Sequence, residues 1–267
     1  IDDFNVASAA ALTSTDVLTG GDGVDILHFT AAQTVVDSQL TGVSTVETLS
    51  SGNVAMTITL GAQSQEAGIV TVTLGNAANT LVASGRSTAL TITGGTGIDK
   101  ITGTTGNDTI DGGTGVDIYT FGSTGALNGY DDYNDDLTAG DRVDFSGFLS
   151  GGTFHTTVIE SDGVTDIDIT NKIVLLANAT DGAVAAVDTV SDIFPLIEGL
   201  GDAMTLSSGG KSIIIAGDDS AATAGAEIYF VDDSLGDNVG TIEADDIVNV
   251  ATFDLNIGTL DAGNFIT

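Results

Sequence analysis

The chain has 267 residues, of which 38 are acidic and only 5 are basic, so its formal net charge is −33. Such a charge repels phosphate backbones and anionic lipid headgroups, and we therefore expect neither a nucleic acid partner nor membrane insertion. A disordered chain is not expected either, because 42% of the residues are hydrophobic. The chain contains no cysteine, which excludes disulfides, thiol catalysis and zinc–thiolate sites. If the protein works outside the cell, bound metal ions would have to supply the stability that secreted proteins usually gain from disulfides.

The first part of the chain is predicted to form short β-strands separated by tight turns. Residues 1–17 are interpreted as the end of a preceding unit, and a nine-residue unit, GGDGVDILH, follows at Gly20–His28. Between residues 40 and 93, four short runs alternate apolar and small polar residues, as strands do. These runs are Met56–Leu60, Val70–Leu74, Leu81–Ser84 and Leu90–Thr93. Short strands at regular spacing favour the coils of a parallel β-solenoid.

Three nine-residue units follow one another directly from Gly94 to Thr120, namely GGTGIDKIT, GTTGNDTID and GGTGVDIYT. Each has glycine at its first and fourth positions, aspartate at its sixth and an apolar or aromatic residue at its eighth. This order predicts a tight turn, a carboxylate, and then a short strand whose eighth residue faces the core. The eighth residues are Ile101, Ile110 and Tyr119. The preceding segment, 85–93, has Leu90 where the units have aspartate, so we expect it to be a coil without a metal ligand.

The aspartates of the first and third units are predicted to share one Ca²⁺. Calcium takes six to eight oxygen ligands, which carboxylates and the backbone carbonyls of glycine turns can supply. If two units make one coil of the solenoid, residues 18 positions apart lie on the same side of it. Asp99 and Asp117 have this separation and are therefore expected to flank the ion. The carbonyls expected to complete the site belong to Gly95, Gly97, Gly113 and Gly115.

Asp108 is predicted to lie on the opposite side of the coil and to bind calcium less well. Its neighbours at 18 positions would be Leu90 and Ala126, and neither side chain is a ligand. Further oxygens would have to come from water or from its own unit, where the candidates are Gly106, Asn107 and Asp111. The interpretation without metal is that the units are surface Gly–Asp turns, against which three units in strict register argue.

The unit at Gly20–His28 has no second unit 18 residues away, so two interpretations stay open for it. In the first, it is a surface turn that binds no ion. In the second, it is a further calcium site in which Asp25 is the ligand, with Asp22 and Gly23 as helpers. The spacing of the units does not decide between these alternatives.

A change in composition near residue 122 predicts two domains in an all-β chain. Residues 1–121 would form the solenoid, and residues 122–267 an acidic β-rich domain with a secretion signal at its end. The second part contains longer apolar runs and a candidate helix; these are Lys172–Leu176, Ser212–Ala216, Ile228–Val231 and 183–200. Its acidic loops either bind further calcium or form a solvated surface; they are Asp131–Asp136, Asp218–Asp219, Asp232–Asp237 and Glu243–Asp246.

The nine-residue units resemble the RTX (repeats-in-toxin) family, whose nonapeptide is Gly-Gly-x-Gly-x-Asp-x-apolar-x. Thr104 departs from this pattern at the second position of the middle unit. Segment 136–149 is similar to the segment that follows such repeats, and the last residues, LDAGNFIT, are similar to the end of chains exported by type I secretion. Segment 40–49, LTGVSTVETL, is similar to bacterial surface-layer and adhesin proteins. The resemblance implies a calcium-bound β-roll, export without a cleaved signal peptide, and folding outside the bacterial cell.

No catalytic motif stands out in the sequence, so we do not expect an enzyme. The zinc motif His-Glu-x-x-His and the nucleophile motif Gly-x-Ser-x-Gly are absent, and the two histidines, His28 and His155, are interpreted as ordinary strand or turn residues. We expect a calcium-binding extracellular protein of a surface layer, adhesin or matrix filament, which self-associates or binds neighbouring surface subunits. One alternative is the C-terminal calcium-binding and secretion region of an exported protease or lipase. Another is an adhesin domain that holds a sugar through calcium in residues 122–267.

Overall fold

The computed structural model describes residues 1–8, 11–134, 137, 140–155, 167–177, 204–207, 209–217, 225–233, 242, 244–254 and 260–267. The chain divides into two compact units. Unit 1 comprises residues 1–121, 126–135 and 139–143, and unit 2 comprises residues 122–125, 136–138 and 144–267. The predicted boundary near residue 122 thus falls at the end of the first segment of unit 1, to which two later segments return. Within the described part of the chain, no helix has the length and apolar character needed to cross a membrane.

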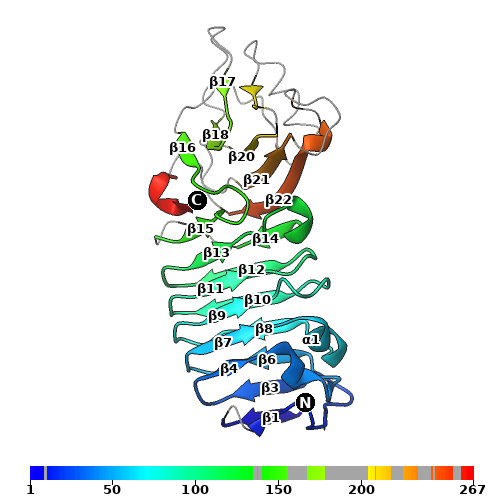
Figure 1. Cartoon of the computed structure of the whole chain (residues 1–267). Helices are drawn as coiled ribbons and strands as arrows, with labels where there is room; N and C mark the ends of the chain where they lie inside the picture. The colour runs from blue at the N-terminus through cyan, green and yellow to red at the C-terminus, as the bar shows by residue number, and fades with distance from the viewer. Residues whose placement is uncertain are drawn as a thin grey trace. The chain divides into compact units, whose positions relative to one another are not determined.

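Unit 1 is a parallel β-solenoid built from two sheets, in which each coil passes through one strand of each sheet (Figure 1). Within unit 1, the strands of the first sheet have the order β1-β3-β6-β8-β10-β12-β14, and those of the second have the order β4-β7-β9-β11-β13-β15. The paired strands are parallel and aligned residue by residue, as between β10 and β12 and between β11 and β13. The predicted all-β parallel solenoid is therefore confirmed.

The strands of unit 1 are short, as their alternating apolar and small polar residues predict. Those of the first sheet are β1 (Asp3–Val6), β3 (Ile26–Phe29), β6 (Thr48–Ser50), β8 (Thr71–Thr73), β10 (Thr91–Gly95), β12 (Thr109–Gly113) and β14 (Asp131–Tyr133). Those of the second sheet are β4 (Gln33–Val35), β7 (Met56–Thr59), β9 (Thr80–Val82), β11 (Lys100–Thr102), β13 (Ile118–Thr120) and β15 (Arg142–Asp144). A small parallel pair, β2 (Leu18–Thr19) with β5 (Val43–Ser44), completes the set.

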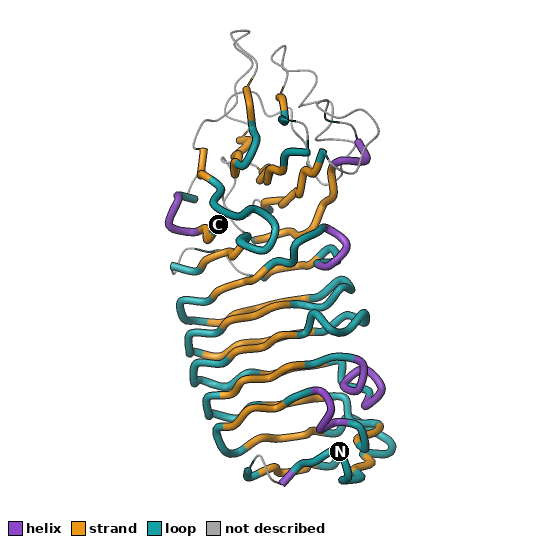
Figure 2. The backbone as a smooth tube through the Cα atoms, viewed as in Figure 1, coloured by secondary structure: helices purple, strands orange, loops and turns teal. Residues whose placement is uncertain are grey.

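Coil length is shortest within the array of nine-residue units. Equivalent residues of consecutive coils are 18 positions apart between Asp99 and Asp117, but 22 apart between Asp25 and Glu47 and 23 apart between Asp108 and Asp131. The longer coils contain extra turn residues, among them η2 (Asp37–Leu40) and α1 (Ala62–Ala67), which contact each other on one edge of the stack (Figure 2). An 18-residue coil consists of two strands and two tight turns only.

The core of unit 1 lies between the two sheets and is filled by every second strand residue. The eighth residues of the array units, Ile101, Ile110 and Tyr119, are at most 1% exposed, so the prediction that they face inward is confirmed. Equivalent residues of the other coils are buried in the same way and include Leu27, Leu49, Val72, Leu81 and Ile92. Burial of each such side chain contributes about 1.5–3 kcal/mol to the stack.

The helix α1 is held by a carboxylate from the preceding coil. Asp37 Oδ1 accepts hydrogen bonds from the N–H groups of Gly61 and Ser64 at 2.7 and 2.9 Å, and its Oδ2 accepts one from Gln63 at 2.9 Å. A carboxylate in this position satisfies the N–H groups at the start of the helix that lack an internal acceptor. Gly68 ends the helix in the left-handed conformation, with a φ of +96°. The turn is thereby fixed without a metal ion.

Unit 2 contains longer strands in a mixed arrangement. Strands β16, β18 and β20 pair in parallel, whereas β21 pairs antiparallel with both β20 and β22. The elements of this unit are β16 (Thr153–His155), β17 (Ile167–Asp168), β18 (Lys172–Ala177), β19 (Met204–Thr205), β20 (Lys211–Gly217), β21 (Ala226–Asp232), η4 (Ala244–Asp246), β22 (Ile247–Phe253), η6 (Ala262–Asn264) and β23 (Phe265–Ile266), while η3 (Gly125–Leu127) begins at the last residue of its segment 122–125. The three predicted apolar strands are confirmed, while the candidate helix over 183–200 lies outside the described residues.

Candidate metal centre

Consecutive coils have an equivalent position at or directly before the strand of the second sheet, and from Asn79 onwards this position carries a polar side chain. These residues form a column, here called column A, which consists of Met56, Asn79, Asp99, Asp117 and Asp141. The N–H of each column residue donates a hydrogen bond to the side-chain oxygen of the next, over 3.0, 2.8, 2.7 and 2.6 Å in chain order. Asp99 and Asp117 therefore occupy equivalent positions in consecutive coils, and their predicted pairing at 18 residues is confirmed.

Asp99 is a buried carboxylate with one oxygen engaged and one open. Its side chain is fully buried, and Oδ1 accepts hydrogen bonds from the backbone N–H and the Nδ2 of Asn79, at 2.8 and 3.0 Å. Oδ2 is buried too, and no described residue donates a hydrogen bond to it. Burial raises the pKa of Asp99, and the hydrogen bonds from Asn79 and the nearby backbone of Gly95 offset this only in part. A buried carboxylate oxygen without a donor is costly and fits a site for a hard cation.

The first glycine of each unit leaves room for the carboxylate of the same unit. A Cβ placed on Gly94 would lie 3.0 Å from Asp99 Oδ2 and only 1.9 Å from the carbonyl oxygen of Gly112. A Cβ on Gly112 would likewise lie 2.8 Å from Asp117 Oδ2. Any other residue at these positions would collide with the carboxylate or with the neighbouring backbone. This explains why glycine at the first position accompanies aspartate at the sixth.

The glycines predicted as carbonyl ligands also lie in the stacked turns. Gly95 and Gly113 face each other across β10 and β12, and the carbonyl of Gly95 accepts a hydrogen bond from Thr114 N–H at 2.8 Å. The carbonyl oxygen of Gly97 would lie 2.1 Å from a Cβ on Gly115. These oxygens line the turns between the two coils, and their role as calcium ligands stays a prediction.

A second column lies before the strands of the first sheet and is here called column B. It consists of Asp2, Asp25, Glu47, Val70, Leu90, Asp108 and Asp131. The prediction that Asp108 lies on the side opposite Asp99 is confirmed. Leu90 is its neighbour in the preceding coil, as predicted, and the N–H of Leu90 donates to Asp108 Oδ1 at 2.7 Å. The prediction that Ala126 is the neighbour in the following coil is wrong. The following coil has 23 residues instead of 18, and it brings Asp131 next to Asp108.

Asp108 is satisfied by protein donors, unlike Asp99. Thr104 donates its N–H to Asp108 Oδ2 at 2.6 Å and its hydroxyl to Oδ1 at 2.9 Å. The two side-chain oxygens predicted as helpers point elsewhere, because Asn107 accepts from Tyr130 N–H and Asp111 accepts from Gly113 N–H. The carbonyl of the third helper, Gly106, would lie 2.2 Å from a Cβ on Gly129 in the next coil. Both carboxylate oxygens of Asp108 therefore accept hydrogen bonds from the protein.

Two neighbouring acid groups of column B, Asp108 and Asp131, have raised pKa values. Burial raises the pKa of Asp108, although hydrogen bonds from Thr104 and Leu90 and the charge of Arg86 act in the opposite direction. Burial, together with the charge of Asp108, raises the pKa of Asp131 to about 8. Because the carboxyl groups of Asp108 and Asp131 are buried next to each other, the state in which both are ionised is disfavoured.

The unit at Gly20–His28 takes its place in column B. Asp25 is fully buried directly before β3, whereas the two residues expected to help it, Asp22 and Gly23, are exposed. The coil before it contributes Asp2 and the coil after it contributes Glu47. Neither of these acids belongs to a nine-residue unit, and the spacing of the units did not point to them.

Four residues of the two columns were not predicted as partners of the unit aspartates, namely Glu47, Asn79, Asp131 and Asp141, although Asp131 was named within an acidic loop. Each stands two positions before an inward-facing residue, which are Leu49, Leu81, Tyr133 and Val143 in the same order. The same interval separates the sixth and eighth positions of the nine-residue units. A search for a polar residue followed two positions later by an apolar one would have found them, whereas a search for glycine could not.

The acidic loops of the second half are only partly solvated. Asp131, Asp233 and Asp246 are at most 2% exposed, whereas Asp132 and Asp245 are exposed. Asp232 lies 3.2 Å from the ammonium group of Lys211. The other predicted loop residues, among them Asp135, Asp136, Asp218, Asp237 and Glu243, lie outside the described residues. In the described ranges, no three His, Cys, Asp or Glu side chains gather as a metal cluster.

The nine-residue units match a known repeat. Residues 10–31 and 91–123 match the RTX calcium-binding nonapeptide repeat, in four copies. No curated protein matches the chain. The matched residues include four buried aspartates of the two columns, Asp25, Asp99, Asp108 and Asp117, and the glycines that make room for them. The chain therefore carries RTX calcium-binding nonapeptide repeats folded as a parallel β-roll, and Ca²⁺ is the ion that such repeats bind.

Proposed function

We propose that this chain is a non-enzymatic structural protein of the bacterial cell surface that folds on calcium outside the cell and then assembles with neighbouring subunits. The observation that carries the proposal is the pair Asp99 and Asp117. Both are fully buried in consecutive coils, and the second oxygen of Asp99 is buried without a donor among the described residues. Such an arrangement opposes folding until a cation reaches it.

Asp99 and Asp117 would hold the ion, with carbonyl oxygens of the adjacent glycine turns as further ligands. Bound calcium supplies positive charge that offsets carboxylates buried between the coils. The chain itself orients these carboxylates: the N–H of Asp99 donates to Asp117, and the N–H of Asn79 donates to Asp99. Coil stacking and ion binding are thereby coupled, because each carboxylate reaches its position only when the neighbouring coil is in register.

The net charge of −33 supports folding outside the cell. Self-repulsion of this size disfavours a compact chain where calcium is scarce, whereas calcium at extracellular concentrations shifts the equilibrium towards the folded state by mass action. RTX repeat proteins are typically secreted. A surface layer, an adhesin or a matrix filament is the assembly we favour. A catalytic motif encoded outside residues 1–267 would instead favour the secretion region of an exported enzyme.

Circular dichroism in calcium and in chelator, followed by light scattering, tests the proposal. We expect the chelated chain to have a weaker β signal and a lower melting temperature, and to regain both when calcium is restored. We also expect the calcium-bound chain to form larger particles as its concentration rises. An unchanged β signal and melting temperature in chelator would refute calcium-dependent folding. A chain that folds in calcium but stays monomeric at high concentration would refute self-assembly.

A further inference from the structure

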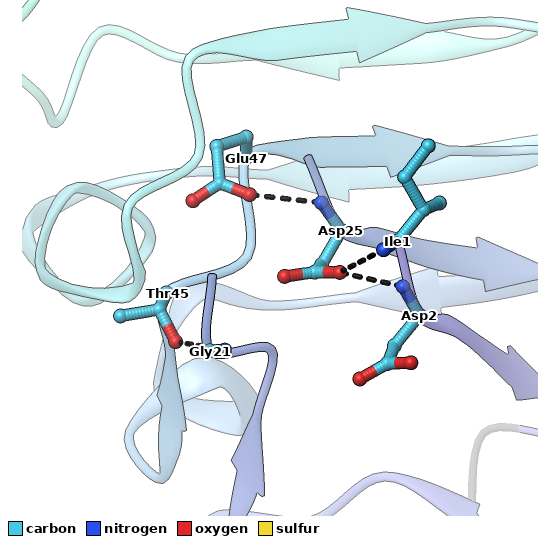
Figure 3. A network of polar contacts seen from close by, with 6 residues as sticks. All are labelled: Ile1, Asp2, Gly21, Asp25, Thr45 and Glu47. Atoms are coloured by element: carbon cyan, nitrogen blue, oxygen red, sulfur yellow. Dashed lines mark hydrogen bonds and ion pairs between the residues drawn. The ribbon is translucent and has the colours of Figure 1, made fainter. Parts of the chain in front are cut away.

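The first coils of the solenoid contain a second oxygen cluster, centred on Asp25 in column B. Asp25 is fully buried, and its Oδ1 accepts a hydrogen bond from the N–H of Asp2 and lies 3.8 Å from the nitrogen of Ile1 (Figure 3). Its Oδ2 is buried, and none of the described residues donates to it. The cluster thus repeats the combination seen at Asp99, with one oxygen engaged by the neighbouring coil and one left over.

Glu47 completes the pair from the next coil. Its Oε2 accepts the N–H of Asp25 at 2.9 Å, in the same way that Asp117 accepts the N–H of Asp99. Figure 3 shows the other oxygen of Glu47 and the open oxygen of Asp25 on the side where Thr45 and Gly21 lie. Glu47 lies outside both segments that match the nonapeptide repeat.

The backbone of the neighbouring turn brings a third oxygen to the same place. A Cβ on Gly20 would lie 2.0 Å from the carbonyl oxygen of Thr45 and 2.5 Å from Asp25 Oδ2, so both oxygens face the Cα of this glycine. Thr45 has a φ of +49°, which is uncommon for a β-branched residue. Its hydroxyl accepts a hydrogen bond from Gly21 N–H at 2.7 Å, which holds the two turns together.

We propose that Asp25 and Glu47 bind a Ca²⁺ between the coils of β3 and β6, with the carbonyl oxygen of Thr45 as a further ligand. Two carboxylates and a carbonyl form an all-oxygen donor set, which suits a hard cation of this size. The site would join one nine-residue unit to a coil that has none, and Glu47 would take the role that Asp117 has in the array. This inference rests on the proposed calcium-dependent function.

Counting the bound ions in single-site variants of the whole chain tests the inference. We expect Glu47→Gln to lower the number of bound Ca²⁺ by one per chain, measured by equilibrium dialysis and by calorimetric titration. Glutamine keeps an oxygen that can accept the N–H of Asp25, so the coil should persist, which circular dichroism in calcium checks. Asp25→Asn should give the same loss of one ion. The matched control is Glu66→Gln, which removes an exposed carboxylate of α1 and should leave the number unchanged.

The outcomes separate this site from the proposed function. If Glu47→Gln and Asp25→Asn keep every ion and its affinity while Asp99→Asn loses one, the inference is wrong and the function of the array stands. A loss in Asp25→Asn and Asp22→Asn, but not in Glu47→Gln, would also overturn it, because the ligands would then lie within the unit alone. An unaltered chain that binds no calcium would overturn the proposed function together with the inference.

Discussion

The two sides of the array carry equivalent aspartates but neutralise them differently. On the column A side, the second oxygen of Asp99 is buried and receives no hydrogen bond from any described residue. On the column B side, Thr104 donates to both oxygens of Asp108. Thr104 occupies the second position of its unit, where the first unit has Gly95. The hydroxyl of Thr104, which glycine lacks, is therefore a protein donor that Asp108 has and Asp99 does not.

A buried cationic side chain, Arg86, adds to the difference between the column A and column B sides. Arg86 is 3% exposed, and its guanidinium donates to the hydroxyl of Ser64 at 3.1 Å, to the carbonyl of Ile69 at 2.7 Å and to Thr88. Its charge lowers the pKa of Asp108 against the effect of burial. These contacts lie in the coils where column B has Val70 and Leu90 instead of acids. The middle of the solenoid thus contains a positive charge of its own, whereas the coils of Asp99 and Asp117 would need calcium.

The largest effect is expected from removing this cation with Arg86→Met. Breaking a buried charged network leaves the polar groups of Ser64 and Ile69 without their donors, which costs about 3–5 kcal/mol. Urea unfolding should show the same loss in calcium and in chelator, because no ion takes part in these contacts. Lys100→Met, a substitution at an exposed residue of β11, serves as the control and should cost far less. If the stability lost in Arg86→Met were restored by saturating calcium, Arg86 would not stabilise its coils independently of the ion.

The second prediction compares the aspartates of the two columns directly. Asp99→Asn and Asp117→Asn should each abolish the stabilisation that calcium gives through their site, about 2.7 kcal/mol at a calcium concentration of 100 times Kd. Asp108→Asn should leave this calcium-dependent stabilisation nearly unchanged. In chelator the stability of Asp99→Asn should not fall, because the change removes a buried charge while keeping an oxygen for the N–H of Asn79. Melting curves over a calcium titration measure all three. Equal calcium effects at Asp99 and Asp108 would remove the distinction between the sides.

The sequence predicted the array well because its period and its core residues are local. The 18-residue coil and the inward positions of Ile101, Ile110 and Tyr119 follow from spacing alone, and the structure confirms them. The prediction failed where the coil changed length. Residues 122–130 enter a 23-residue coil, so Asp131 instead of Ala126 reaches Asp108. Residues inserted in a turn of the solenoid leave the strands aligned but change the number of residues between equivalent positions of consecutive coils. No local sequence pattern predicts such an insertion.

The electrostatic differences were equally hidden, because they depend on residues from other coils. Arg86 and Asp108 are far enough apart in sequence that no motif joins them, yet the charge of one acts on the other. The departure of Thr104 from the glycine pattern was visible, but its consequence was not. Only the conformation of the turn shows that its N–H and hydroxyl both reach the carboxylate of Asp108, four residues later in the same unit.

The pH dependence of the metal-free chain gives the third prediction. The pKa of Asp131 is raised to about 8, and those of Asp99 and Asp108 are raised as well. A carboxyl whose folded-state pKa lies above its unfolded value binds protons more tightly in the folded state, so its stability contribution is present at low pH and is lost as pH rises through the folded pKa. In chelator, the melting temperature should therefore fall between about pH 5 and pH 8.

Calcium should reverse this slope, because ligand carboxylates must lose their protons before the ion binds. Asp131→Asn should flatten the metal-free slope, whereas Asp132→Asn, which removes an exposed neighbour, should leave it as it is. A melting temperature in chelator that rises over the same pH range would show that these buried acids do not govern the metal-free stability.

The smallest effect is expected from Thr104→Gly, which restores the repeat pattern on the column B side. Glycine keeps the backbone N–H, but the carboxylate of Asp108 loses the hydroxyl donor of Thr104, which is worth about 1–2 kcal/mol in chelator. Calcium should then recover part of this loss, because Oδ1 of Asp108 keeps only the N–H of Leu90 as a donor and can bind a cation in place of the hydroxyl. Thr105→Gly, which adds the same backbone freedom one position later, controls for the entropy of glycine and should show no recovery in calcium. Equal losses of Thr104→Gly in calcium and in chelator would mean that the second position does not decide how the aspartate is neutralised, and Arg86 alone would then account for the difference between the two sides.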